Sequence, residues 1–118
     1  MSHISPEIAC DVLEKWASES LPVCFAVSMG NLAWHAHWVG SIRNALDGRW
    51  VLTANGTTNV VCPYEFKEII LIEDPELLGM RFRSPNGSLD SDFEVNLFVA
   101  KAGRLDGDAQ ALMEKMIQ

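Results

Sequence analysis

The stretch LAWHAHWVGSIRNALDGRWVLTANGTTNVVCPYEFKEIILIE, which runs from Leu32 to Glu73, decides the fold. Its β-branched and aromatic runs are separated by Asp47-Gly48 and Asn55-Gly56. An Asp-Gly or Asn-Gly pair between two such runs is a strong hairpin signal, because both central residues of the favoured turn need a positive φ. The stretch therefore predicts an antiparallel meander of short strands, and the rest of the chain is expected to pack around it.

The first strand of this meander is expected to bend at Gly40. Side chains alternate along the strand, and one face collects the residues best suited to a core: Trp34, Ala36, Trp38, Gly40 and Ile42. A glycine inside a strand weakens it but permits a sharp bend or the close approach of another backbone segment. Such a bend is what a small barrel needs in order to close.

Helices are expected at both ends of the chain. Ser5 is a suitable N-cap and Pro6 suits the first helical position, so a helix is predicted over residues 6–18. The apolar stripe that should lie on the sheet consists of Ile8, Val12, Leu13 and Trp16. A second apolar stripe predicts a helix over residues 108–117 and consists of Ala109, Leu112, Met113, Met116 and Ile117.

Six or seven strands are predicted between these helices, within residues 23–100. The expected fold class is mainly β, or β-rich α+β: a strongly bent antiparallel small barrel with an N-terminal and a C-terminal helix. A chain of 118 residues can bury a core without disulfides or metals, and it shows no internal boundary. We therefore interpret residues 1–118 as a single domain.

Composition argues against several classes of protein. The chain has 16 acidic and 9 basic residues, a net charge of −7, whereas nucleic-acid binders carry a basic excess. No apolar run approaches the ~20 residues that span a bilayer, and the N-terminus lacks the pattern of a signal peptide. We expect a cytoplasmic location and no membrane partner, and the charge argues against a nucleic-acid partner. The three dispersed cysteines are expected to be reduced.

The segment from Trp38 to Glu73 contains a bend glycine in WVGSI, an acidic turn LDG, a strand RWVLTA, the run TTNVVCPYEF and the apolar run EIILIE. In this order it resembles the Sm-like (SH3-like) small β-barrels. The resemblance implies a strand that bends at a glycine, pairs with its successors and ends in a strand that seals a ring between subunits. It therefore implies self-assembly. The nucleic-acid-binding loop signatures of the RNA-binding members have no counterpart in this sequence.

His35 and His37 are the candidate metal ligands. An H-x-H pair on a strand directs both imidazoles to one face, close enough to share a metal ion. A catalytic metal would need a third ligand, for which Cys62, Glu65 and Glu68 are the candidates. The alternative interpretation is that the two histidines are simply the polar face of an amphipathic strand.

Two further surfaces are predicted from alternation. Residues 69–72 are apolar on both faces and Phe98 falls on a polar face, so Ile70, Ile72 and Phe98 are the candidate partner interface. Arg81 and Arg83 share a face and are the candidate anion contact, unless nearby carboxylates pair with them.

No nucleophile elbow, phosphate-binding loop or dinucleotide fingerprint is present, so no catalytic residue and no cofactor are predicted. The function class that we favour is a non-enzymatic cytoplasmic module that self-associates, as a homo-oligomer, or binds a protein partner. The alternative is a barrel that binds a small ligand or a metal on the His35/His37 face. RNA binding is the least favoured class because of the charge.

Overall fold

A computed structural model describes residues 2–29, 35–54, 56–85 and 93–101; of residues 28–29, 35–38, 57, 84–85 and 93 only the backbone is described. The helix α1 (Pro6–Ser18) confirms the predicted bounds, and the Ser5 side chain caps it by accepting a hydrogen bond of 3.2 Å from the Ile8 backbone N–H. The C-terminal helix predicted over residues 108–117 lies outside the described residues.

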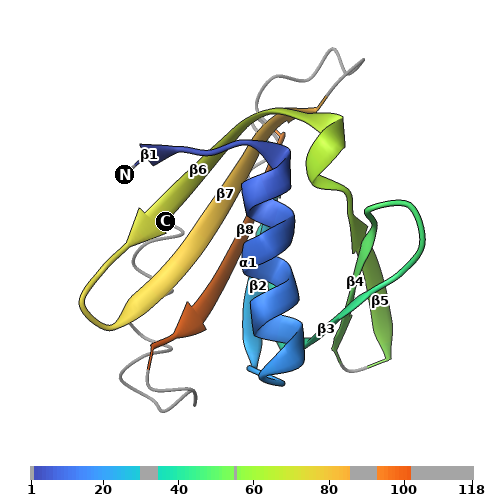
Figure 1. Cartoon of the computed structure of the whole chain (residues 1–118). Helices are drawn as coiled ribbons and strands as arrows, with labels where there is room; N and C mark the ends of the chain where they lie inside the picture. The colour runs from blue at the N-terminus through green and yellow to red at the C-terminus, as the bar shows by residue number, and fades with distance from the viewer. Residues whose placement is uncertain (1, 30–34, 55, 86–92, 102–118) are drawn as a thin grey trace.

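Eight strands among the described residues form one antiparallel sheet in the order β1-β6-β7-β8-β2-β3-β4-β5 (Figure 1). The strands are β1 (Ser2–His3), β2 (Val23–Met29), β3 (His35–Asn44), β4 (Trp50–Ala54), β5 (Thr57–Val61), β6 (Phe66–Glu73), β7 (Leu77–Pro85) and β8 (Phe93–Ala100). The mainly β, antiparallel fold class is therefore confirmed.

The long strand β3 changes partner at Gly40, the position where the sequence predicts a bend or the close approach of another backbone segment. Residues up to Gly40 pair with β2, and those from Ser41 onward pair with β4. A Cβ atom at Gly40 would overlap the carbonyl oxygen of Thr53, so only a glycine lets the two backbones come this close. The bend carries β4 and β5 away from the other strands and toward α1 (Figure 1).

Both predicted tight turns are present. Asp47 and Gly48 have φ angles of 62° and 70°, which is the left-handed region that an Asp-Gly hairpin turn requires. Ala54 pairs with Thr57, so β4 and β5 are joined by a two-residue loop, in which Gly56 has a φ of 78°. These turns fix the register of the β3–β4–β5 meander.

The sheet is not closed into a barrel, and the expectation of closure is corrected here. After β5 the chain forms the 3-10 turn η2 (Pro63–Glu65), which packs against α1, and re-enters the sheet at β6, beside β1 and β7. Strands β5 and β6 are consecutive in the sequence but lie far apart in the strand order. The helix α1 packs across the sheet between the two ends that a barrel would have to join (Figure 1).

The main core lies between α1 and the sheet. From α1 it receives Ala9, Leu13 and Trp16, which pack on apolar side chains from β2 to β8. Ile8 is exposed, so the predicted stripe was off by one position at its start: residues 9, 13 and 16 follow the helical repeat, and Ile8 lies to one side of it. A smaller cluster on the other face of the sheet consists of Cys24, Ile70, Ile72, Leu77, Phe98 and Ala100.

Candidate functional site

Strand β5 forms one edge of the sheet, and we call Thr57–Val61 the β5 edge. Among the described residues it pairs with β4 alone, and it stands last in the strand order. Its sequence, TTNVV, contains no charge and no proline, and the Val60 side chain is 58% exposed. An edge strand presents a row of backbone N–H and C=O groups, which makes it a template for pairing with another chain.

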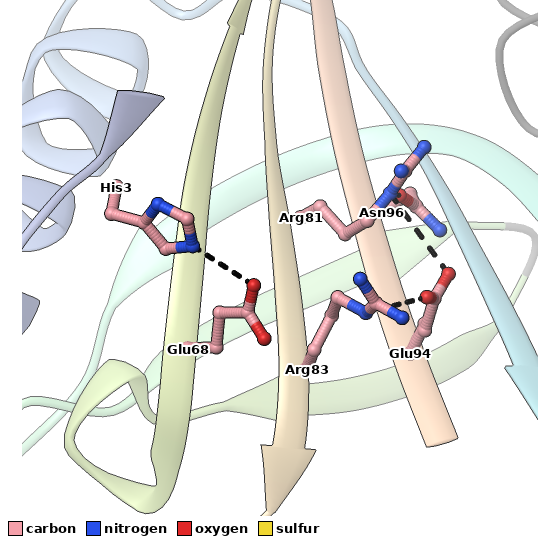
Figure 2. Close-up of polar contacts among 6 residues, drawn as sticks. All are labelled: His3, Glu68, Arg81, Arg83, Glu94 and Asn96. Atoms are coloured by element: carbon pink, nitrogen blue, oxygen red, sulfur yellow. Dashed lines mark hydrogen bonds and ion pairs between the residues drawn. The ribbon is translucent and has the colours of Figure 1, made fainter. Parts of the chain in front are cut away.

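The opposite edge is β1, which has only two residues. Ser2 and His3 pair with Leu71 and Ile70 of β6, and the chain is held further by a 3.0 Å hydrogen bond from Ile4 N–H to the Ile69 carbonyl. His3 is exposed, and its Nε2 lies 2.9 Å from Glu68 Oε1 (Figure 2). A short, polar edge of this kind gives another strand little to pair with.

A polar row crosses β7 and β8 on the face turned away from α1. Arg81 Nε donates a 2.8 Å hydrogen bond to Oδ1 of Asn96, which is only 2% exposed, and Arg83 Nε lies 2.8 Å from Glu94 Oε1. Glu94 also lies 3.9 Å from Arg81 Nε (Figure 2). Each predicted anion-binding arginine therefore has a partner within the chain, and the carboxylate of Glu94 already compensates part of their positive charge. Anion binding by these arginines stays a prediction.

His35 and His37 lie on β3, which pairs with β2: His37 pairs with Ala26, and His35 pairs with Ser28. The same two β2 residues pair with Asn96 and Glu94 on their other side. Antiparallel register thus places the two histidine positions in line with the polar row, two strands away. Their side chains lie outside the described residues, and metal binding stays a prediction.

The candidate third ligands do not strengthen the metal prediction. Glu68 is engaged by His3, and no group of three or more histidine, cysteine or acidic side chains within the described part of the chain could hold a metal ion. Cys62 and Glu65 lie at η2, which follows β5 in the chain. In the strand order, β4 and β5 lie on the other side of β3 from β2.

Ile70, Ile72 and Phe98 are buried within the single chain, and Phe98 is 0% exposed. The expectation that Phe98 points outward is corrected here. Phe98 pairs with Gly79 of β7, and a Cβ atom at Gly79 would overlap the phenyl ring, so the ring lies over the glycine. The three residues leave little apolar surface for a partner, and their role as an interface stays a prediction.

Sequence reasoning missed a groove between α1 and the β3–β4 turn, with a volume of about 510 Å³. Its lining residues come from α1, the end of β3, the turn, β4 and η2: Cys10, Asp11, Glu14, Asn44, Ala45, Leu46, Asp47, Gly48, Trp50 and Tyr64. Leu46 is 84% exposed and Tyr64 is 49% exposed. These residues are dispersed in the sequence and share no motif, so only the packing of α1 against the turn brings them together.

The groove has a protonated thiol in its wall. Burial raises the pKa of the Cys10 thiol. A hydrogen bond from the Trp50 indole N–H to the Cys10 sulfur opposes this shift, and the nearby Cys62 and Asp11 raise the pKa further. Partial burial, followed by the charges of Glu7 and other nearby acidic groups, also raises the pKa of the Tyr64 hydroxyl. Both groups therefore stay neutral at neutral pH, and the charge of the groove comes from its carboxylates.

The sequence matches no protein-family model, and no curated protein or solved structure is significantly similar to the chain. The resemblance to Sm-like proteins accordingly stays a prediction. No helix among the described residues combines the length and apolar character needed to cross a bilayer.

Proposed function

We propose that this protein is a non-enzymatic module that works by self-association, in which the β5 edge of one copy pairs with the β5 edge of a second copy. The observation that carries the proposal is the contrast between an uncharged, five-residue edge at β5 and a two-residue, polar edge at β1. Strand addition supplies affinity through main-chain hydrogen bonds, and the flanking side chains supply specificity.

A two-fold axis through Asn59 gives the simplest arrangement. Antiparallel pairing about this axis sets Asn59 opposite Asn59 of the second copy and Thr58 opposite Val60 of the second copy. Directly opposed side chains on antiparallel strands have Cβ atoms about 5 Å apart, within reach of each other. A two-fold contact of this kind is self-complementary and closes after two copies.

The overall charge predicts the salt dependence of the association. Each copy carries a net charge of −7, so two copies repel one another at long range, while TTNVV itself is uncharged. Salt screens this repulsion, with a Debye length of about 10 Å at 0.1 M. Self-association through the β5 edge should therefore strengthen as salt is added.

The test is light scattering coupled to size exclusion, over about a hundredfold range of protein concentration. Ser41, Thr53 and Thr58 occupy one row across β3, β4 and β5, and Ser41 and Thr58 are both exposed. Thr58→Lys should abolish the dimer, because a lysine on an edge strand blocks pairing. Ser41→Lys adds the same charge to an inner strand and should dimerise like the wild type.

Two results would overturn this proposal. A wild-type protein that stays monomeric over the whole range would exclude self-association. A dimer that survives both Thr58→Lys and Val60→Lys would exclude the β5 edge as its interface.

A small-ligand or metal site on the His35/His37 face is the second candidate. The register that aligns these positions with Glu94 and Asn96 supports it, since the polar row could contribute to a site there. Stoichiometric zinc that is lost in the His35→Ala/His37→Ala variant would support this candidate, and a metal-free wild type after exposure to zinc would exclude it. RNA binding is the least favoured, because the acidic charge opposes it.

A further inference from the structure

We propose that the outer face of the sheet is a docking surface for the C-terminal segment of the same chain, residues 102–118, which lie outside the described residues. The outer face is the face turned away from α1, where the smaller cluster around Phe98 lies. This docking is separate from the β5 edge and does not depend on self-association.

The outer face is too deeply buried to be the uncovered side of a sheet. Phe98 is 0% exposed, Cys24 is 1% exposed and Ile72 is 5% exposed. One side of the Phe98 ring lies against Gly79, so the other side faces away from the strands. An antiparallel sheet with a solvated face would leave such a ring partly in water. Because a single chain already buries the ring, atoms of that chain must lie over the cluster.

The described elements do not supply this cover. Outside the sheet, the described residues form the helical elements α1 and η2. The helix α1 packs on the opposite face, in the main core, and η2 packs against α1 (Figure 1). Strands β4 and β5 bend toward α1 and so away from the outer face. The cover must therefore come from residues outside the described ranges.

The cluster lies at the end of the sheet where the C-terminal segment begins. One row crosses β6, β7, β8 and β2 and consists of Ile72, Gly79, Phe98 and Cys24. Ala100, at the end of β8, extends the cluster beyond this row. The Lys101 N–H donates a 2.8 Å hydrogen bond to the Glu76 carbonyl, which fixes the start of the segment beside the cluster.

The other undescribed segments are placed less well. Residues 30–34 connect β2 to β3 and residues 86–92 connect β7 to β8, both at the Phe93 end of the sheet. A strand advances about 17 Å between Phe93 and Phe98. Apart from Leu89, residues 86–92 are glycine or polar and offer little apolar surface. The C-terminal segment is therefore the best candidate for the cover.

The C-terminal segment also has a suitable pattern and length. Its apolar side chains recur at i, i+3, i+4, i+7 and i+8, on one face of a helix, and are Ala109, Leu112, Met113, Met116 and Ile117. A helix over residues 108–117 would be about 15 Å long, and the row from β6 to β2 is about 14 Å wide. Residues 102–107 can extend over about 20 Å, which is enough to bring this helix onto the outer face.

The test measures how fast a maleimide reagent labels the Cys24 thiol in the full chain. Cys24 lies in the covered row, so labelling requires the outer face to open. Cys10→Ser/Cys62→Ser is the background for every measurement, and it leaves Cys24 as the one cysteine of the chain. The serine hydroxyl at position 10 keeps an acceptor for the Trp50 N–H.

Leu112→Asp/Met116→Asp introduces two charges into the apolar stripe. It should speed the labelling of Cys24 by at least about tenfold, because a charged stripe loosens the cover and labelling proceeds through local opening. The matched control is Ala111→Asp/Gln118→Asp, which adds the same charge on the opposite side of the expected helix. The control should label at the rate of the background protein.

A series of disulfide cross-links keeps the proposal testable if the charged variant unfolds. Leu112→Cys, Met113→Cys and Met116→Cys each place a second thiol in the stripe, and Ala111→Cys places one on the other side. Oxidised glutathione is the oxidant: one thiolate attacks it, the second thiolate displaces the remaining glutathione, and two glutathione thiols are released as the protein S–S bond forms. At least one stripe variant should form this bond with Cys24 within one chain, and Ala111→Cys should not, as mass spectrometry of digested protein will show.

Three results would overturn the proposal: equal labelling rates in the stripe and control variants, a cross-link in Ala111→Cys with none in the stripe variants, or a bond that joins two chains. Both measurements are repeated in Thr58→Lys, where pairing through the β5 edge is blocked. The results should not change there, so a failure of this proposal is distinguishable from a failure of the proposed dimer.

Discussion

The two ends of the sheet differ both at their edges and in the layers behind them. Behind β1, strands β6, β7 and β8 bury apolar side chains on both faces, in the main core and in the smaller cluster around Phe98. Behind the β5 edge, β4 contributes Trp50, Leu52 and Ala54 to the main core, and on its other face only Val51 is buried, outside the smaller cluster. The first end is therefore complete within one chain, while the second leaves an uncharged strand and an exposed Val60 at its border.

The comparison identifies where an interaction is to be expected. A doubly apolar strand in a sequence suggests an interface, yet here the doubly apolar strand β6 is satisfied within the chain. The surface available for pairing lies instead on a strand whose sequence, TTNVV, looks unremarkable. The free edge is a property of topology, because β5 and β6 are adjacent in sequence and are placed at different ends of the sheet.

The largest expected effect concerns Phe98, which lies in the part of the sheet behind β1. Phe98→Ala should lower the free energy of unfolding by about 3–5 kcal/mol, because it removes a fully buried ring and leaves a cavity over Gly79. Urea unfolding measures this change. Leu52→Ala, at a fully buried position behind the β5 edge, should cost about 2–5 kcal/mol and serves as the matched core substitution.

Repeating the urea unfolding of Phe98→Ala at several protein concentrations tests the comparison between the two ends of the sheet. If Phe98 belongs to the interior of one chain, the loss of stability should be the same at low and high concentration in the Thr58→Lys background. A loss that disappears as the protein is diluted would mean that Phe98 is covered by another copy, and would remove the distinction between the two ends.

An intermediate effect is expected in the polar row. Arg81→Met removes the partner of the buried Asn96 side chain and should cost about 1–3 kcal/mol, since a buried polar group is left unsatisfied. Arg83→Met breaks a more exposed pair with Glu94 and should cost about 0–1 kcal/mol. Thermal or urea unfolding of the two variants checks the order, and equal costs would contradict the role that we assign to the burial of Asn96.

Much of the fold could be predicted from the sequence because its signals are local. Ser5 and Pro6 define the start of α1, and the bounds of α1 agree with the predicted range. Gly40 was expected to bend a strand or admit another backbone, and it does both. Each of these features depends on a few neighbouring residues and on rules of backbone geometry.

The remaining features depend on contacts between distant segments. The path from β5 through η2 to β6 has no local signal, so the open sheet could not be distinguished from a closed barrel. Phe98 lies on the polar face of its strand by alternation, and its burial depends on Gly79 in the neighbouring strand. The groove likewise combines residues from α1, a turn and η2, which come together only when α1 packs against that turn.

The smallest expected effect concerns the β1 edge. His3→Ala removes the contact with Glu68 and should change the free energy of unfolding by less than about 1 kcal/mol, because the pair is largely solvent-exposed. The oligomeric state should not change, because β1 is too short to accept another strand. Light scattering of His3→Ala beside Thr58→Lys compares the two edges directly. Dissociation caused by His3→Ala, with Thr58→Lys still dimeric, would reverse the assignment and place the interface at the β1 edge.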